Sequence, residues 1–107
     1  TATDRGDVAE THATADILGN RVPISAFKSY TGHTLGACGA LEAWVAVEMM
    51  NQGRFHHTAN LEQVDPECAE LDYITRESRT LDCEHVMSNN FAFGGINTSL
   101  IFRRWSS

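Results

Sequence analysis

The chain has 107 residues, of which 42% are apolar and 21% charged, and its formal net charge is −6. That length is enough for one domain with a core and too short for two. Arg103 and Arg104 form the only basic cluster, so no nucleic-acid partner is expected, because phosphate binding needs a concentrated basic face. No apolar run approaches the roughly 18 residues needed to span a bilayer, so no membrane span is expected either.

Cysteine usage indicates the redox compartment. Cys38, Cys68 and Cys83 are odd in number and lack the Cys-x-x-Cys spacing, which favours a reducing compartment over a disulfide framework. The chain opens with Thr1, and no signal peptide precedes its first helical pattern. We therefore expect a cytoplasmic protein, and we expect this chain to be a piece of something longer.

Apolar periodicity and turn residues predict the elements in chain order. A helix is expected over 7–18, where Gly19 and Asn20 follow as a stop signal. A longer helix is expected from about Leu35 to Gln52, ended by Gly53. The expected strands cover 22–27, 71–77, 85–93 and 97–105, and Gly94-Gly95 joins the last two as a tight connection. This order indicates the α/β or α+β class.

The stretch "SYTGHTLGACGALEAW", residues 29–44, places His33 just before a helix that starts with small residues. Two glycines in its first turn cost about 1 kcal/mol each relative to alanine, which suggests that another requirement repays them. Lys28 is predicted to end the preceding strand, at the kind of position where α/β folds present ligand-facing groups. A neutral His33 imidazole there could donate to a developing oxyanion. The plainer alternative is a hydrogen-bonded core histidine beside a solvated lysine.

Three further features could carry chemistry. Cys38 is interpreted as a small buried hydrophobe and not as a nucleophile paired with His33. His56 and His57 are interpreted as loop residues, because adjacent histidines point apart and no third ligand has matching spacing, so no metal is expected. In "NNFAFGGIN", residues 89–97, the side chains of Phe91 and Phe93 would share one face of a strand before the sharp Gly-Gly reversal.

Three blocks of the chain resemble the C-terminal part of the β-ketoacyl synthases, the condensing enzymes of the thiolase superfamily. "KSYTGHTLGACGALEA" resembles the family's Lys-Ser-x-x-Gly-His-x-x-Gly-Ala-x-Gly block, and "SNNFAFGGINTSLIF" resembles its Asn-Ser-Phe-Gly-Phe-Gly-Gly-Thr-Asn block. "TATDRGDVAE" resembles the segment after the family's His-Gly-Thr-x-Thr motif. The blocks have the family's order and spacing, so we identify residues 1–107 as the C-terminal segment of such a synthase.

The resemblance implies a decarboxylative Claisen condensation of malonyl carrier protein with an enzyme-bound acyl thioester, in fatty-acid or polyketide synthesis. His33 would stabilise the enolate oxygen, and Lys28 would sit beside it as the second catalytic residue of this segment. Thr1 and Thr3 would bind the phosphopantetheine arm, and Phe93 would gate the acyl cysteine with Gly94 and Gly95 as its pivot. The supporting polar network would comprise Asp7, Glu10, Phe91 and Asn97.

The same resemblance implies a fold and partners. The expected fold is the C-terminal part of a thiolase-like α/β fold, a mixed sheet flanked by helices that is incomplete without its N-terminal portion. The nucleophilic cysteine and a second histidine would lie in that portion, so this chain alone should be inactive. The expected partners are acyl carrier protein, the missing portion and a second subunit in the full-length dimer. No cofactor is expected beyond the phosphopantetheine that carries the substrates.

Departures from the family pattern concern the gate and the loops. Ala92 and Ile96 stand for a usual Gly and Thr around the gate, and His56-His57 stands where two prolines are usual. The main alternative to a synthase segment is a non-catalytic partner subunit of the chain-length-factor kind. A third interpretation is an independent binding domain. The retention of both Lys28 and His33 favours the enzyme.

Overall fold

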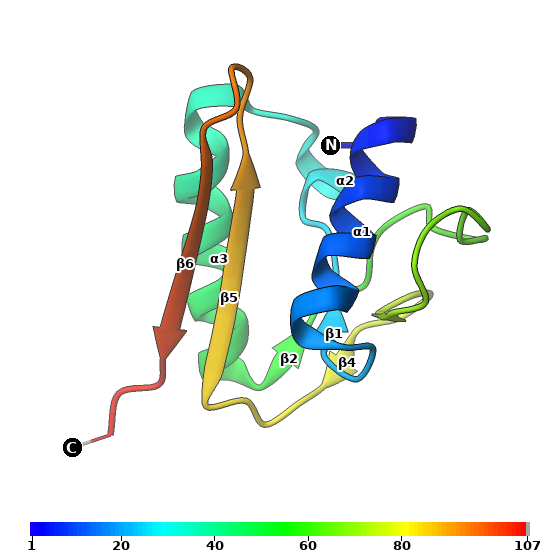
Figure 1. Cartoon of the computed structure of the whole chain (residues 1–107). Coiled ribbons are helices and arrows are strands. Elements are labelled where there is room, and N and C mark those ends of the chain that lie inside the picture. The colour runs from blue at the N-terminus through cyan, green and yellow to red at the C-terminus, as the bar shows by residue number, and fades with distance from the viewer. Residues whose placement is uncertain (107) are drawn as a thin grey trace. The chain divides into compact units, whose positions relative to one another are not determined.

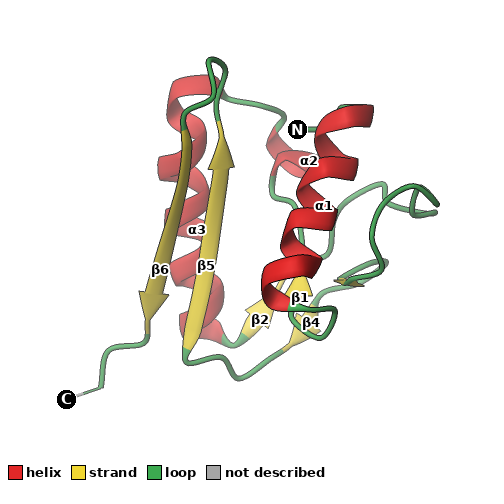
Figure 2. Cartoon of the chain, viewed as in Figure 1, coloured by secondary structure: helices red, strands yellow, loops and turns green. Residues whose placement is uncertain are grey.

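The computed structural model describes residues 1–106, and contacts divide the chain into two compact units. The first unit comprises Thr1–His33 and His56–Ser78, and the second comprises Thr34–Phe55 and the chain from Arg79 onward. The described strands form three separate two-stranded sheets. Figure 1 follows the chain from its N-terminus, and Figure 2 colours its helices and strands.

Helix α1, Asp4–Leu18, opens the first unit. Asp4 and Asp7 lie in its first turn, where the partial positive charge of the helix N-terminus favours carboxylates. Gly19 ends the helix at a φ of 72° and donates its N–H to the Ala15 carbonyl at 2.9 Å. The expected helix over 7–18 is therefore confirmed, with one more turn at its start.

The β-structure of the first unit is short. Strand β1, Pro23–Ile24, pairs in parallel with β3, Asp72–Tyr73. The Ile74 N–H donates to the Ile24 carbonyl at 2.9 Å, and Ile74 is 2% exposed. The buried strand expected over 22–27 is thus reduced to two half-buried residues.

Helix α2, Lys28–Thr31, follows β1 and is a single turn. Gly32 ends it at a φ of 70° and donates its N–H to the Lys28 carbonyl at 2.8 Å. Lys28 therefore begins a helix and does not end a strand, which corrects the sequence-based prediction. The physical reason is that β1 stops at Ile24, because its partner β3 offers only two residues for pairing.

A 3₁₀ turn η1, Leu35–Ala37, leads directly into helix α3, Cys38–Gln52, in the second unit. Gly53 ends α3 in the left-handed conformation, and its N–H donates to the Met49 carbonyl. The long helix expected over 35–52 is confirmed, with its glycine-containing start wound as a 3₁₀ turn. Cys38, Ala46 and Met50 are the buried residues of α3.

The second unit also holds the longest strands. Strand β5, His85–Phe91, pairs antiparallel with β6, Asn97–Arg103, in a register that sets Met87 opposite Ile101. Strand β2, Arg54–Phe55, pairs antiparallel with β4, Arg79–Thr80, and this small sheet was not predicted. Helix α3 packs along β5, as Figure 1 shows.

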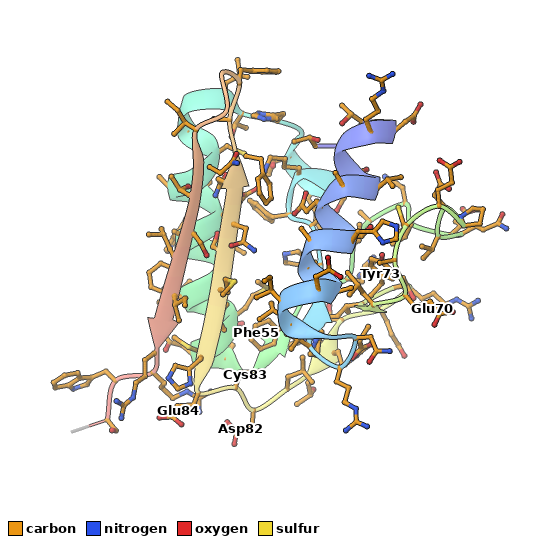
Figure 3. The ribbon with its side chains drawn as sticks, in the orientation of Figure 1. Phe55, Glu70, Tyr73, Asp82, Cys83 and Glu84 are labelled. Atoms are coloured by element: carbon orange, nitrogen blue, oxygen red, sulfur yellow. The ribbon has the colours of Figure 1, made fainter. Side chains whose placement is uncertain are left out.

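An arginine ties the end of the chain to α3. Arg104 donates from Nη2 to the Met50 carbonyl at 2.9 Å and pairs through Nη1 with Asp82 at 2.9 Å. A guanidinium is favoured here because the last carbonyls of a helix carry partial negative charge. Glu84 accepts the backbone N–H of Arg104 at 2.8 Å, and Figure 3 shows Asp82, Cys83 and Glu84 on the connection that enters β5.

Candidate active site

His33 lies between the end of α2 and the start of η1. The positive φ of Gly32 turns the chain there, and the imidazole is exposed. Lys28 is half-buried one helical turn earlier. The structure therefore presents the predicted histidine at the entrance to a helix, and it places the predicted lysine on the short helix that leads to it.

Contacts within residues 1–106 do not explain the two glycines after His33. A methyl group at Gly36 would meet nothing within 4 Å, and one at Gly39 would lie 3.5 Å from Asn90 Nδ2, an ordinary contact. The residues that the structure describes therefore do not require glycine at either position. The role of these glycines remains a prediction.

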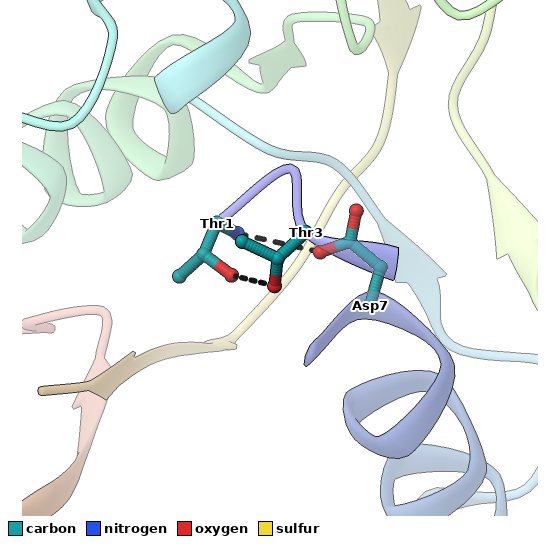
Figure 4. A network of polar contacts seen from close by, with 3 residues as sticks. All are labelled: Thr1, Thr3 and Asp7. Atoms are coloured by element: carbon teal, nitrogen blue, oxygen red, sulfur yellow. Dashed lines mark hydrogen bonds and ion pairs between the residues drawn. The ribbon is translucent and has the colours of Figure 1, made fainter. Parts of the chain in front are cut away.

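The first residues of the chain form a small polar network, drawn in Figure 4. The hydroxyl oxygens of Thr1 and Thr3 lie 3.2 Å apart, and the Thr1 backbone nitrogen lies 3.4 Å from Asp7 Oδ1. Gly6 completes the arrangement, because a Cβ there would lie 3.0 Å from the Thr1 hydroxyl and would collide with that of Thr3. The structure thus brings together three of the predicted site residues.

The predicted gate residues lie on the connection between β5 and β6. Gly94 and Gly95 have φ values of 85° and 83°, which side chains rarely adopt, so glycine is required by the backbone. Ala92 donates its N–H to the Ile96 carbonyl at 2.9 Å and accepts that of Gly95 at 3.2 Å. Phe93 is 85% exposed at the tip. The expected tight connection is confirmed, and the gating role remains a prediction.

The predicted site residues divide between the two units. The first unit holds Thr1, Thr3, Asp7, Glu10, Lys28 and His33. The second holds Phe91, Phe93, Gly94, Gly95 and Asn97.

An aromatic cluster beside α2 was missed by the sequence reasoning. The hydroxyl of Tyr30 lies 3.2 Å from His57 Nδ1, and its ring is 5.2 Å from that of His56 between centroids. Phe27 completes the cluster, with its ring 5.7 Å from His56. Two features signalled it in the sequence: Tyr30 lies inside the Lys-Ser-x-x-Gly-His block, and the histidines replace the family's usual prolines.

The remaining candidates were a cysteine and the histidine pair. Cys38 is 4% exposed and donates from Sγ to Glu42 Oε1 at 3.5 Å, which agrees with its interpretation as a small buried residue.

Within residues 1–106 no three His, Cys, Asp or Glu side chains are grouped so as to hold a metal ion. Among those residues no helix has the length and apolar character needed to cross a membrane.

The structure perturbs the titration of Tyr73. Burial raises the pKa of its phenol, the nearby Cys68 raises it further, and Thr11 acts in the opposite direction. The hydroxyl donates to the Ala69 carbonyl at 2.7 Å, in the region labelled in Figure 3. Tyr73 therefore fastens the segment before β3 and carries no sign of a catalytic role.

Comparison with known proteins identifies the family. The sequence model described as "Beta-ketoacyl synthase, C-terminal domain" matches residues 1–62. The 3-oxoacyl-[acyl-carrier-protein] synthase 2 of Synechocystis is 42% identical over 98% of this chain, which covers 26% of that protein. The corresponding synthase 1 of Escherichia coli K12 is 40% identical over 97% of this chain, again 26% of the relative.

Solved structures agree with the sequence relatives. A β-ketoacyl synthase from Burkholderia phymatum matches 99% of this chain and 26% of its own, with a TM-score of 0.97 and 67% identity. A ketosynthase in complex with its chain length factor, from Xenorhabdus doucetiae, matches 94% of this chain and 26% of its own, with a TM-score of 0.86 and 37% identity. The expected α/β class, part of a thiolase-like C-terminal domain, is confirmed, and the chain spans about a quarter of these relatives. The chain therefore belongs to the β-ketoacyl synthase family.

Proposed function

We propose that residues 1–107 are the C-terminal segment of a 3-oxoacyl-[acyl-carrier-protein] synthase that extends acyl chains by decarboxylative condensation. The observation that carries this proposal is the exposed His33, held between the Gly32 turn and the start of η1 and α3. The sequence identities of 40–42% to named synthases, over almost the whole chain, support the same proposal. Because the chain spans about a quarter of them, the activity belongs to the complete synthase.

The proposed reaction forms one carbon–carbon bond and breaks two bonds. An acyl group waits as a thioester on a cysteine in the remainder of the synthase. The malonyl thioester on the carrier protein loses its carboxylate as CO₂, and the electron pair left behind forms an enolate. The enolate carbon attacks the acyl carbonyl and expels the cysteine thiolate. His33 donates a hydrogen bond to the enolate oxygen, so it stabilises charge that develops only during decarboxylation.

The other residues have supporting roles in this proposal. Lys28, Asp7 and Glu10 hold the polar network around His33, and the hydroxyls of Thr1 and Thr3 bind the phosphopantetheine arm. The 3.2 Å hydrogen bond between these hydroxyls holds them side by side, which supports a shared ligand. Phe93 gates the acyl cysteine on the Gly94-Gly95 pivot, with Phe91 and Asn97 in the supporting set. The positive φ values of both glycines support that pivot.

The proposed partners follow from the incomplete span of the chain. Strand β6 has exposed apolar side chains, with Leu100 at 46% and Ile101 at 65% exposure, which supports contact with the remainder of the synthase. We propose that the complete protein is a cytoplasmic dimer that receives substrates from acyl carrier protein. It needs no cofactor of its own, since phosphopantetheine arrives with the substrate.

A non-catalytic chain-length-factor-like subunit is the second candidate function. The Xenorhabdus doucetiae structure contains both a ketosynthase and a chain length factor, which keeps this candidate open. Incubating the complete protein with acyl carrier protein charged with an acyl group, followed by mass spectrometry of its peptides, distinguishes the two. An acyl group on a cysteine is expected for the synthase. A protein that stays unmodified, with another residue at the nucleophile position, would be the non-catalytic partner.

A further inference from the structure

We propose that His56 and His57 are positioning residues, which hold the α2 turn so that Lys28 and His33 keep their places in the active site. This inference rests on the proposed function, because it assigns the histidine pair to the same site. All the residues involved belong to the first unit. This role does not require either histidine to contact the substrate.

The first contact is a hydrogen bond from the penultimate residue of α2. The Tyr30 hydroxyl lies 3.2 Å from His57 Nδ1 and 3.4 Å from His57 Nε2. In either tautomer of a neutral imidazole, one of these nitrogens can accept from the hydroxyl and the other can donate to it. The hydroxyl is therefore tied to the His57 ring just before the chain turns at Gly32 into His33.

Ring packing adds to that bond on both sides of Lys28. The Tyr30 ring meets His56 edge to face, at 5.2 Å and 77°, and it meets His57 at 5.8 Å and 74°. Phe27 lies 5.7 Å from His56. Edge-to-face and tilted pairs at these distances are the favourable geometries for aromatic rings. Phe27 and Tyr30 lie on either side of Lys28 in the chain. By packing against these two rings, His56 and His57 restrain the backbone that carries Lys28.

Two hydrogen bonds from backbone N–H groups to side-chain hydroxyls also fasten the same two segments. The Ala26 N–H donates to Thr58 Oγ1 at 3.0 Å, and the Ala59 N–H donates to Ser29 Oγ at 2.8 Å. These bonds hold the start and middle of the turn without the histidine rings. The rings extend the hold to Tyr30, so removing them should loosen the His33 end of the turn without unfolding the segment.

Two variants of the complete synthase test the hydrogen bond. Tyr30→Phe and His57→Phe should each lower kcat for decarboxylation of malonyl carrier protein about fivefold, as expected for one lost bond near the site. KM should not change. The double variant should lose no more than either single one, because both remove the same bond. His57→Gln keeps an acceptor and should retain activity near the wild-type value.

Hydrogen exchange gives a readout that needs no activity. The Gly32 N–H, bonded to the Lys28 carbonyl at 2.8 Å, should exchange faster in Tyr30→Phe and His57→Phe than in the wild type. The matched control is His85→Phe, an exposed histidine at the start of β5 in the second unit, which should change neither readout.

The outcomes separate the two levels of the proposal. Unchanged exchange at Gly32, or a double variant whose loss is the product of the single losses, would overturn the positioning role. A wild-type synthase that does not decarboxylate malonyl carrier protein would overturn the proposed function instead. In that case the exchange measurement still decides whether the histidines hold the turn.

Discussion

Different kinds of interaction stabilise the interior of each of the two units. In the first, helix α1 and the loops are joined by bonds from side chains to distant backbone groups, such as Thr11 Oγ1 accepting the Ala69 N–H at 3.1 Å and His12 Nε2 lying 2.9 Å from the Glu67 carbonyl oxygen. In the second, a 15-residue helix packs along two seven-residue strands. The predicted catalytic residues Lys28 and His33 both lie in the first unit, where single side-chain hydrogen bonds hold the loops.

The largest effect is expected at His33, in the first unit. His33→Ala in the complete synthase should lower malonyl decarboxylation about 10²- to 10³-fold, the usual cost of losing an oxyanion donor. Transfer of the acyl group to the nucleophilic cysteine should be spared, because that step develops charge elsewhere. Separate assays of CO₂ release and acyl-enzyme formation check this. Wild-type CO₂ release from the variant would contradict the assignment.

Core truncations sharpen the comparison of the two units. Ile74→Ala and Met50→Ala remove side chains that are 2% and 3% exposed, in the first and second unit respectively. Each should destabilise its surroundings by about 3 kcal/mol through lost burial and the cavity left behind. Hydrogen exchange should show the faster amides of each variant in its own unit. Equal loosening of both units by either variant would show that they unfold as one body.

The gate tests a conformational requirement of the second unit. Gly95→Ala places a side chain at a φ of 83°, which should cost about 1–2 kcal/mol of backbone strain. Elongation should slow while decarboxylation is spared, because the change is confined to the connection that carries Phe93. Gly19→Ala is the matched control, since it adds a side chain in open space at a similar φ of 72° but away from the gate. Equal elongation rates for Gly95→Ala and the wild type would contradict the pivot.

The smallest effect is expected at Tyr73 and at alkaline pH. Because its folded-state pKa is raised, its contribution to stability is complete below the unfolded value of about 10 and is lost as pH rises through the folded value. Tyr73→Phe should therefore flatten the alkaline decline in stability. It should also remove about 1 kcal/mol at neutral pH with the lost bond to the Ala69 carbonyl. Unfolding in denaturant at several pH values measures both, and an unchanged alkaline slope would contradict the expectation.

The sequence predicted the regular elements and the order of the motifs. Both long helices end at glycines that the structure places at positive φ, and the Gly94-Gly95 turn joins the two expected strands. Such signals are local, so they can be read from neighbouring residues. The strand over 22–27 was too long, because strand length depends on how many residues a distant partner offers.

The arrangement of the site was predictable only in part. The residues of the polar network and the gate were identified by motif, but their contacts depend on folding. The bond between Tyr30 and His57 joins residues 27 positions apart, and nothing in their local sequence fixes that distance. The small sheet of β2 and β4 was missed for the same reason, since two residues give no periodic signal.

Condensation by the complete synthase tests the central claim most directly. Purified enzyme would be given an acyl carrier protein charged with an acyl group and malonyl carrier protein, with mass spectrometry of the carrier-bound product and a count of released CO₂. The account predicts a 3-oxoacyl product two carbons longer than the starting acyl group, with one CO₂ per product. A folded protein that forms neither product nor CO₂ would contradict it.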